Sequence, residues 1–198
     1  MHNVIALDAD GVLLDYSLAY ARAWRRAFGT MPEQREPKAY WPIDCWGVER
    51  LAGERLAKLK ACFDEEFWST MPAVAGSLDA SRRLVAAGYR LICVTAVESS
   101  YAEARRRNLF SLGFPLDEVL ATGSSGASPK AATINALSPA AFVDDYLPYH
   151  DGVAESVHRA LILRAPIGSP NTGPGLQQID STHVDLQAFA DWWLSRGF

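Results

Sequence analysis

The sequence predicts an α/β protein: a doubly wound, Rossmann-like parallel sheet with an inserted small helical cap. Two observations predict the sheet. Short apolar runs recur along the chain, as in parallel strands that are buried on both faces, and segments with helix signals separate them. A third observation predicts the insertion, because the segment between the first two apolar runs is far longer than one crossover helix requires.

The predicted strands share an apolar run of four to six residues. They are Val4 to Leu7, Arg90 to Thr95, Ala140 to Val143 and Ala160 to Leu163, with a weaker candidate at Glu118 to Leu120. In a doubly wound sheet, ligands bind at the carboxyl ends of the strands. The residues that follow each strand are therefore the candidates for function.

Helix signals lie between these strands. Ser77 is the expected N-cap of a helix that ends at Gly88, and Ser99 that of a helix that ends at Gly113. Ser128 followed by Pro129 predicts the start of a third helix, because proline suits the first helical position. A last helix is expected around Leu186 to Leu194, where we interpret the tryptophans as packing residues.

The inserted segment runs from about Tyr16 to Pro72, and its pattern is helical. Apolar periodicity predicts helices over Leu18 to Phe28 and Val48 to Trp68, with a loop between them. We therefore assign 1–15 and 73–198 to the core, and 16–72 to a helical cap over the end of the first strand. In its loop, Arg35, Lys38, Trp41 and Trp46 are candidates for substrate contact, with packing and solvated charge as the alternative.

Composition and charge exclude several classes of function. The chain has 198 residues, 49% of them hydrophobic, which is enough for a core. Lysines and arginines are scattered and the net charge is −4, so we expect no nucleic acid polymer as a partner. No apolar run approaches membrane-spanning length, and the start MHNVIALDAD lacks the basic segment of an export signal, so we expect no membrane contact.

The three cysteines indicate a reducing compartment. Cys45, Cys62 and Cys93 are odd in number and form no CxxC pair, so neither a disulfide framework nor a zinc site is predicted. We expect a cytoplasmic protein. The oligomeric state stays open.

Asp8 and Asp10 follow the first predicted strand directly. Their period-two spacing would turn both carboxylates the same way if the strand continued. Two close carboxylates repel each other unless a cation or a proton lies between them. A polar turn after a strand is the alternative for this pair alone, but the position at the ligand crevice favours a site.

Asp144 and Asp145 follow another apolar strand in the same manner. They bring a third and a fourth carboxylate to the same edge of the sheet. Several carboxylates at one edge call for a hard cation, and oxygen ligands suit Mg²⁺. An acidic turn that caps the next helix is the alternative.

Thr95 and Lys130 are the candidates for phosphate binding. Thr95 ends its strand, where its hydroxyl and nearby N–H groups would hold a phosphoryl oxygen, although a threonine at this position is common. Lys130 falls at the second position of a predicted helix, where the helix dipole disfavours a cation by roughly 0.3–1 kcal/mol. A cation there answers an anion in the site, or else is simply solvated.

Taken in order, these motifs resemble those of the haloacid dehalogenase (HAD) superfamily. The four motifs of that family match Asp8 with Asp10, then Thr95, Lys130, and Asp144 with Asp145, and the match spans the chain. The position of the insertion is similar to that of the family's C1 cap. The resemblance implies a Rossmann-like fold, an aspartate nucleophile and dependence on Mg²⁺.

The resemblance also implies roles for single residues. Asp8 would attack phosphorus, and Asp10 would act as general acid and then general base, while its backbone carbonyl helps to hold the metal. By similarity to the family's spaced motif, Asp145 would be the direct metal ligand and Asp144 its neighbour, but the sequence leaves this choice open. Members that cleave carbon–halogen bonds lack the second aspartate, so Asp10 favours phosphoryl transfer.

We therefore expect a Mg²⁺-dependent phosphomonoester hydrolase that acts on a small phosphorylated metabolite through an aspartyl-phosphate. Sugar phosphates and nucleoside monophosphates are the leading substrate classes. The alternatives are a phosphomutase of the same superfamily and a catalytically idle metabolite-binding protein.

Overall fold

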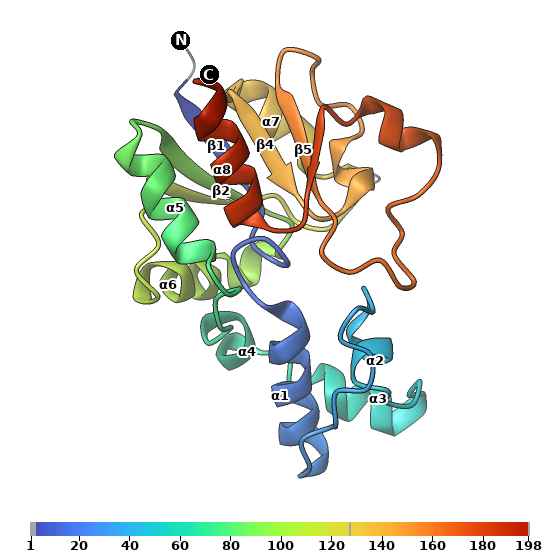
Figure 1. Ribbon diagram of the computed structural model, residues 1–198. Helices are drawn as coiled ribbons and strands as arrows, with labels where there is room; N and C mark the ends of the chain where they lie inside the picture. The colour runs from blue at the N-terminus through green and yellow to red at the C-terminus, as the bar shows by residue number, and fades with distance from the viewer. Residues whose placement is uncertain (1–2, 127, 198) are drawn as a thin grey trace.

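A parallel sheet forms the centre of the computed structural model, which describes residues 3–126 and 128–197 (Figure 1). Its strand order is β3-β2-β1-β4-β5-β6, and every neighbouring pair is parallel. The strands are β1 (Val4–Leu7), β2 (Arg90–Thr95), β3 (Glu118–Ala121), β4 (Ala141–Asp144), β5 (His158–Ile162) and β6 (Ser181–His183). This order, which reverses direction at β1, confirms the predicted doubly wound α/β fold.

The register brings the ends of the central strands together. Leu7 at the end of β1 lies opposite Cys93 of β2 and Val143 of β4. The residues that follow these strands therefore meet at one edge of the sheet. That edge is where the predicted site residues are placed.

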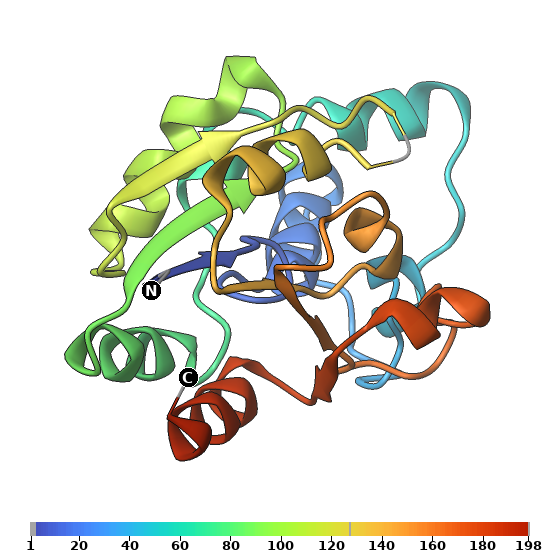
Figure 2. The same cartoon turned by 90° about the horizontal axis from the view of Figure 1, so that it is seen from above.

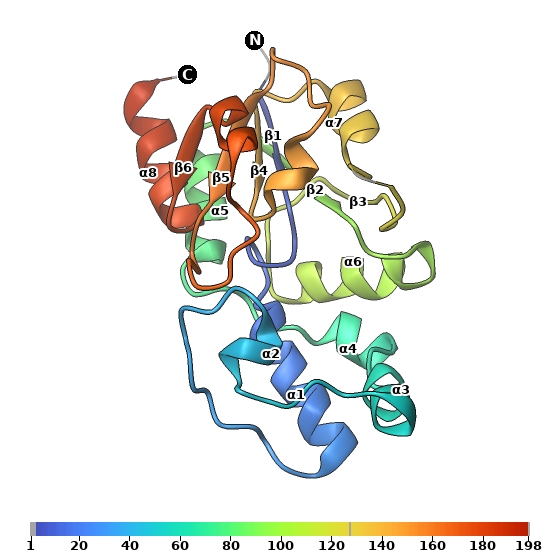
Figure 3. The ribbon, with the colours of Figure 1, turned by 90° about the vertical axis from the view of Figure 1, so that its right-hand side faces the viewer.

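Helices cover both faces of the sheet (Figures 2 and 3). They are α5 (Ser77–Ala86), α6 (Ala102–Ser111), α7 (Ala131–Leu137) and α8 (Leu186–Arg196). Strand residues alternate between the faces, so Ile5 packs in one core cluster with Trp193 of α8, and Ala6 packs in the other with Ile134 of α7. Burial on both faces explains why the strands read as unbroken apolar runs.

The predicted helix starts are wrong by one or a few residues. Gly76, with φ of +77°, is the N-cap of α5, and Ser77 is its first residue. Ser99 begins a 3₁₀ turn, η1 (Ser99–Tyr101), that precedes α6. Lys130 is the N-cap of α7 rather than its second residue. Two further 3₁₀ turns are η2 (Leu147–His150) and η3 (Pro174–Gln178).

Residues 16–72, called here the helical segment, lie at the carboxyl end of the sheet, as Figures 1 and 3 show. Their helices are α1 (Tyr16–Phe28), α2 (Pro42–Cys45), α3 (Gly53–Lys60) and α4 (Glu65–Ser69). The single helix predicted over Val48 to Trp68 is wrong. It is two helices, because the Asp64 carboxylate accepts a hydrogen bond from Phe67 N and starts α4 anew.

Backbone pairing joins the helical segment to the core both at its ends and within its loop. At its ends, Asp15 N donates to Pro72 O over 2.8 Å, and Leu14 and Ala73 form an antiparallel bridge. Within its loop, Ala39 forms a parallel bridge with Ile167, which lies in the stretch after β5. None of the helices in 3–126 and 128–197 is long and apolar enough to cross a membrane.

Candidate active site

Asp8 is the first residue after β1, and a tight turn follows it. Its N–H donates to Val143 O over 2.9 Å, so β1 and β4 stay paired up to the site. Gly11 follows with φ of +86°, and a Cβ there would lie 2.1 Å from Oδ2 of Asp145. Only glycine fits this close approach without strain. The turn therefore brings the residues after β1 against those after β4.

Lys130 is fully buried between two carboxylates. Its Nζ lies 2.5 Å from Oδ1 of Asp8 and 2.6 Å from Oδ2 of Asp144. The prediction that this lysine answers an anion is consistent with this geometry, and the solvated alternative is wrong, since the side chain is 0% exposed. Asp144 also accepts a hydrogen bond from Tyr146 N.

Asp8, Asp144 and Asp145 form a compact cluster of carboxylates. Each contributes an oxygen atom, and these atoms all lie within 4.8 Å of one another. Two cations pair with the cluster. One is Lys130, and the other is Arg164, whose Nη2 lies 2.9 Å from Oδ2 of Asp145. Three carboxylates and two cations leave a surplus of negative charge in a buried place.

Burial is the largest influence on the pKa values of these groups. Burial raises the pKa of Asp8 to about 6, against the opposing effect of Lys130. Burial likewise raises the pKa of Asp145 to about 7, against the opposing effect of Arg164, and raises the pKa of Asp144. Burial also acts to lower the pKa of Lys130, but the carboxylates of Asp144 and Asp8 outweigh it, so this pKa is raised. The lysine is therefore charged, and further positive charge would favour the ionised carboxylates.

Asp10 lies apart from that cluster and has a cation of its own. Arg105 of α6 is fully buried, and its Nη2 lies 2.7 Å from Oδ1 and 2.8 Å from Oδ2 of Asp10. The guanidinium also stacks over the ring of Trp68 at 5.1 Å and contacts Met71 Sδ. Burial raises the pKa of Asp10, and Arg105 is the main opposing influence.

The stretch after β5 completes the surroundings of Asp145. Asn171 Nδ2 donates to Asp145 O over 2.8 Å, and Asn171 Oδ1 accepts from Leu147 N. From the helical segment, the Tyr40 hydroxyl approaches Asp145 O at 3.4 Å. Asp145 is thereby held from two parts of the chain, the stretch after β5 and the helical segment.

Thr95 is buried at the end of β2. Its backbone O accepts hydrogen bonds from Thr122 N, and its side chain is 1% exposed. The next two residues, Ala96 and Val97, line the cavity described below, whereas Thr95 lies behind its wall.

A cavity of about 390 Å³ opens at the end of the sheet and borders the helical segment. Asp8, Asp10 and Asp145 form its floor, and Arg164 lies in its wall. Its other lining residues are Tyr16, Ser17, Tyr40, Trp41, Pro42, Trp68, Ala96, Val97, Tyr146 and Tyr149. The volume is in the range of small-molecule sites.

Of the loop candidates in the helical segment, Trp41 lines this cavity. Trp46 instead donates from Nε1 to Ser17 O over 2.8 Å, which is a packing role. Arg35 packs against Gly47. Sequence reasoning missed Arg105 and Arg164, the two cations that pair with Asp10 and Asp145.

No family model matches the sequence, and no curated protein matches it. Solved structures do match. A HAD family hydrolase from Deinococcus radiodurans R1, with bound phosphate and sodium, is 14% identical, with a TM-score of 0.68 over 99% of this chain and 96% of that one. A predicted phosphoglycolate phosphatase from Haemophilus somnus is 16% identical, with a TM-score of 0.60 over 97% and 98%.

An L-2-haloacid dehalogenase from Xanthobacter autotrophicus also matches, at 13% identity and a TM-score of 0.61 over the whole of both chains. At these identities the similarity concerns the fold. The chain has the fold of HAD superfamily hydrolases, as the resemblance of its motifs implied.

Proposed function

We propose that this chain, which folds as HAD superfamily hydrolases do, is a Mg²⁺-dependent phosphomonoester hydrolase acting on a small organic phosphate through an aspartyl-phosphate. The observation that carries the proposal is the cluster of Asp8, Asp144 and Asp145 beside a small-molecule cavity, with the buried ammonium of Lys130 between Asp8 and Asp144. The fold-sharing hydrolase from Deinococcus radiodurans contains bound phosphate, which is consistent with this chemistry.

The cluster fits Mg²⁺. Its donors are carboxylate oxygens close enough to share one ion, and the three carboxylates are paired with two cations, Lys130 and Arg164. Bound there, Mg²⁺ would neutralise charge on the phosphoryl group. Asp145 lines the cavity whereas Asp144 is fully buried, so we assign Asp145 as the direct ligand and Asp144 as its support. The Asp10 carboxylate lies outside the cluster, and its proposed share in the metal site is its backbone carbonyl.

In the first step, a carboxylate oxygen of Asp8 attacks phosphorus and the bond from phosphorus to the ester oxygen breaks. Asp10 gives its proton to the departing oxygen, which leaves as an alcohol. In the second step, Asp10 takes a proton from water, whose oxygen attacks phosphorus and releases inorganic phosphate. Asp8 is then a carboxylate again, and Asp10 carries the proton for the next cycle.

Other residues offset the charge of the reacting groups or orient them. Lys130 keeps Asp8 oriented and offsets the approach of one anion to another. Thr95 would bind a phosphoryl oxygen, after a small rearrangement of the cavity wall. We propose that residues 16–72 are a cap, because they lie at the carboxyl end of the sheet and their Tyr40, Trp41 and Trp68 line the cavity. All three cysteines are free, which suits the cytoplasm.

Release of inorganic phosphate from acetyl phosphate and p-nitrophenyl phosphate, with Mg²⁺ and with EDTA, tests the proposal. We expect turnover with Mg²⁺ and none with EDTA. Equal rates in both, or no phosphate release with any metal, would refute it. Chloride release from 2-chloropropionate tests for the dehalogenase reaction, and we expect none because Asp10 is present. Isomerised product that depends on a bisphosphate would instead identify a phosphomutase.

A further inference from the structure

The walls of the cavity are aromatic to an extent that the phosphoryl chemistry does not need. Above the carboxylate floor, six aromatic residues line it: Tyr16, Tyr40, Trp41, Trp68, Tyr146 and Tyr149. They come from both sides, because Tyr146 and Tyr149 follow β4 and the other four belong to the helical segment. A bound leaving group would therefore meet rings from the helical segment and from the residues after β4.

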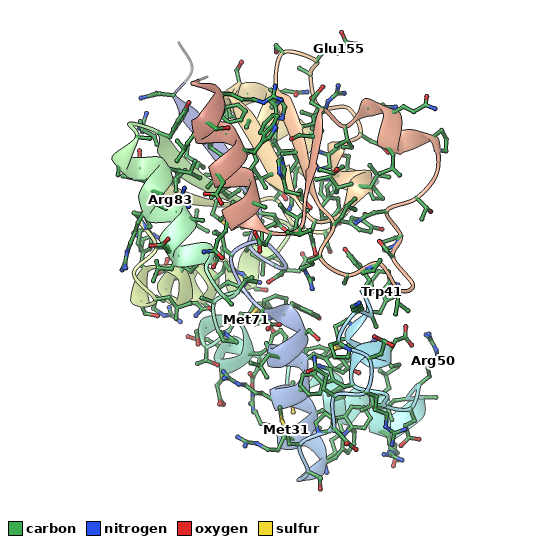
Figure 4. All side chains as sticks on the ribbon, in the orientation of Figure 1. Met31, Trp41, Arg50, Met71, Arg83 and Glu155 are labelled. Atoms are coloured by element: carbon green, nitrogen blue, oxygen red, sulfur yellow. The ribbon has the colours of Figure 1, made fainter. Side chains whose placement is uncertain are left out.

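Trp41 is the ring with the most surface to offer. It is 44% exposed although it borders a cavity, and it meets Tyr40 edge to face, with ring centroids 5.0 Å apart. Figure 4 shows it where the helical segment approaches the stretch after β5. The bridge between Ala39 and Ile167 fixes the backbone just before it. The open indole is thus a positioned surface rather than a loose side chain.

Charge in the cavity restricts the leaving group further. Three carboxylates face the cavity, from Asp8, Asp10 and Asp145. Among the described residues that line it, Arg164 is the sole cation, and it is paired with Asp145. A second anionic group on the substrate would therefore meet aromatic rings and carboxylates, with no unpaired cation to receive it.

We propose that the substrate is a phosphate monoester whose leaving group carries a neutral, planar aromatic ring, which Trp41, Tyr146 and Tyr149 bind. This inference rests on the proposed function and narrows its substrate class. A second cavity, of about 350 Å³, is also lined by Tyr16, Trp41 and Pro42. It contains a cation, Arg50, which lies 3.8 Å from Asp44 Oδ1, so the proposal concerns the first cavity alone.

A pair of synthetic esters isolates the effect of the ring. Benzyl phosphate and cyclohexylmethyl phosphate both release a primary alcohol and have similar size, but only the first has a π-face. We expect kcat/KM to be roughly three- to tenfold higher for benzyl phosphate, the range of aromatic pair energies. 4-Carboxybenzyl phosphate tests the charge, and we expect it to be roughly tenfold poorer than benzyl phosphate, because like charges repel across the site.

Trp41→Leu is the informative variant, since leucine keeps an apolar side chain without the ring. We expect its preference for benzyl over cyclohexylmethyl phosphate to fall toward one. Phe110→Leu is the matched control, because Phe110 is also partly exposed at 37% but is not among the residues that line the cavity. It should keep the wild-type preference. Circular dichroism checks that both variants are folded.

The outcomes separate the two proposals. If acetyl phosphate and all three esters release no phosphate, the proposed hydrolase function is wrong and this inference is wrong with it. If phosphate is released but cyclohexylmethyl phosphate is cleaved as well as benzyl phosphate, only the aromatic leaving group is wrong. An unchanged preference in Trp41→Leu refutes the role of the indole. Faster cleavage of the carboxybenzyl ester refutes the neutral leaving group and points to Arg164 as an anion receptor.

Discussion

At the site, three cations form ion pairs with four carboxylates. Lys130 lies between Asp8 and Asp144, Arg105 pairs with Asp10, and Arg164 pairs with Asp145, as the distances above show. The separate partners give the two aspartates after β1 different surroundings. At the scale of single residues, their roles should therefore be separable by mutation.

Asp8→Asn should abolish turnover of every substrate, because an amide oxygen is a far weaker nucleophile than a carboxylate. Asp10→Asn keeps the backbone carbonyl but removes the proton donor, so an alkyl phosphate should lose about 10²–10⁴ in rate. p-Nitrophenolate leaves without a proton, so its first step should suffer less. Rapid-quench mass spectrometry should then detect phosphorylated Asp8 in the Asp10→Asn variant.

Two results would contradict these roles. One is activity in Asp8→Asn. The other is an equal loss on both substrates in Asp10→Asn with no adduct on Asp8.

Arg105→Met should change the pH dependence of the first step. Arg105 opposes the rise in the pKa of Asp10, so its removal should raise that pKa further, because an adjacent opposite charge is lost. Asp10 then stays protonated to higher pH, and the alkaline limb of kcat/KM for an alkyl phosphate should move upward. Stability should fall by about 2–3 kcal/mol, less than for a fully buried pair, because the Asp10 side chain is 31% exposed.

The same helix offers the control for Arg105. Arg106 is its neighbour in sequence, and its side chain is 55% exposed. Arg106→Met should leave both the pH profile and the stability close to wild type. Equal effects from the two variants would mean that Arg105 acts only through the charge of the helix.

Sequence motifs predicted the carboxylates and Lys130 but not the two arginines. Arg105 stands in a run of three arginines, which resembles a solvated face. Arg105 lies four residues before the buried Leu109, however, so helical periodicity places both side chains on the same, buried face of α6. Arg164 comes just after β5, so the strand-end reasoning used for Asp145 applied to it as well.

Among the elements, the stretch after β5 has the least expected role. Its pairing with the helical segment could not be predicted, because such pairing depends on backbone groups that any residue carries. Tyr40 N donates to Ile167 O over 2.9 Å, and Ile167 N donates to Lys38 O over 3.0 Å. β6 was missed for a related reason, since its three polar residues pair with β5 through backbone groups and present no apolar run in the sequence.

Ile167→Pro should loosen the contact between this stretch and the helical segment. Proline has no N–H, so the bond to Lys38 O is lost while the bond from Tyr40 N stays available. Ile167→Ala is the control, because it shortens the side chain but keeps the N–H. We expect limited proteolysis between residues 30 and 40 to be roughly fivefold faster in Ile167→Pro than in Ile167→Ala, for the loss of about 1 kcal/mol. Equal cleavage rates would show that the bridge does not restrain the segment.

At the scale of the whole molecule, the surplus of negative charge should make stability depend on Mg²⁺. An ion that binds the folded state at about 100 times its Kd adds about 2.7 kcal/mol, or roughly 5–10 °C in Tm for a chain of this size. Asp145→Asn should remove most of this increase, which differential scanning calorimetry would measure. Ca²⁺ should replace Mg²⁺ poorly in turnover, because it prefers looser geometry. A Tm that does not respond to Mg²⁺ would contradict the metal site.

Stability should also fall in acid because of His150. This side chain is 2% exposed and lies against Phe142, and burial lowers its pKa to about 3. In the unfolded chain His150 binds a proton near pH 6.5, whereas in the folded chain it stays neutral to much lower pH. The contribution of neutral His150 to stability is therefore complete above pH 6.5 and is lost as the pH falls. Between pH 8 and pH 5, the loss should be about 2 kcal/mol.

His150→Leu tests this, because the variant has nothing to protonate at that position. Urea unfolding at pH 8 and pH 5 should show a smaller decrease for the variant than for the wild type. An identical decrease in both proteins would assign the acid sensitivity to other groups.

The two ends of the helical segment meet at neighbouring backbone groups, with Asp15 N bonded to Pro72 O and Val74 N bonded to Leu13 O. A short turn could therefore close the sheet domain after excision of everything between them, because the chain has almost no gap to span. The same geometry makes the segment an exchangeable unit. A different set of helices could be transplanted between these two points without moving a strand, which offers a direct route to new substrate preferences on an unchanged catalytic floor.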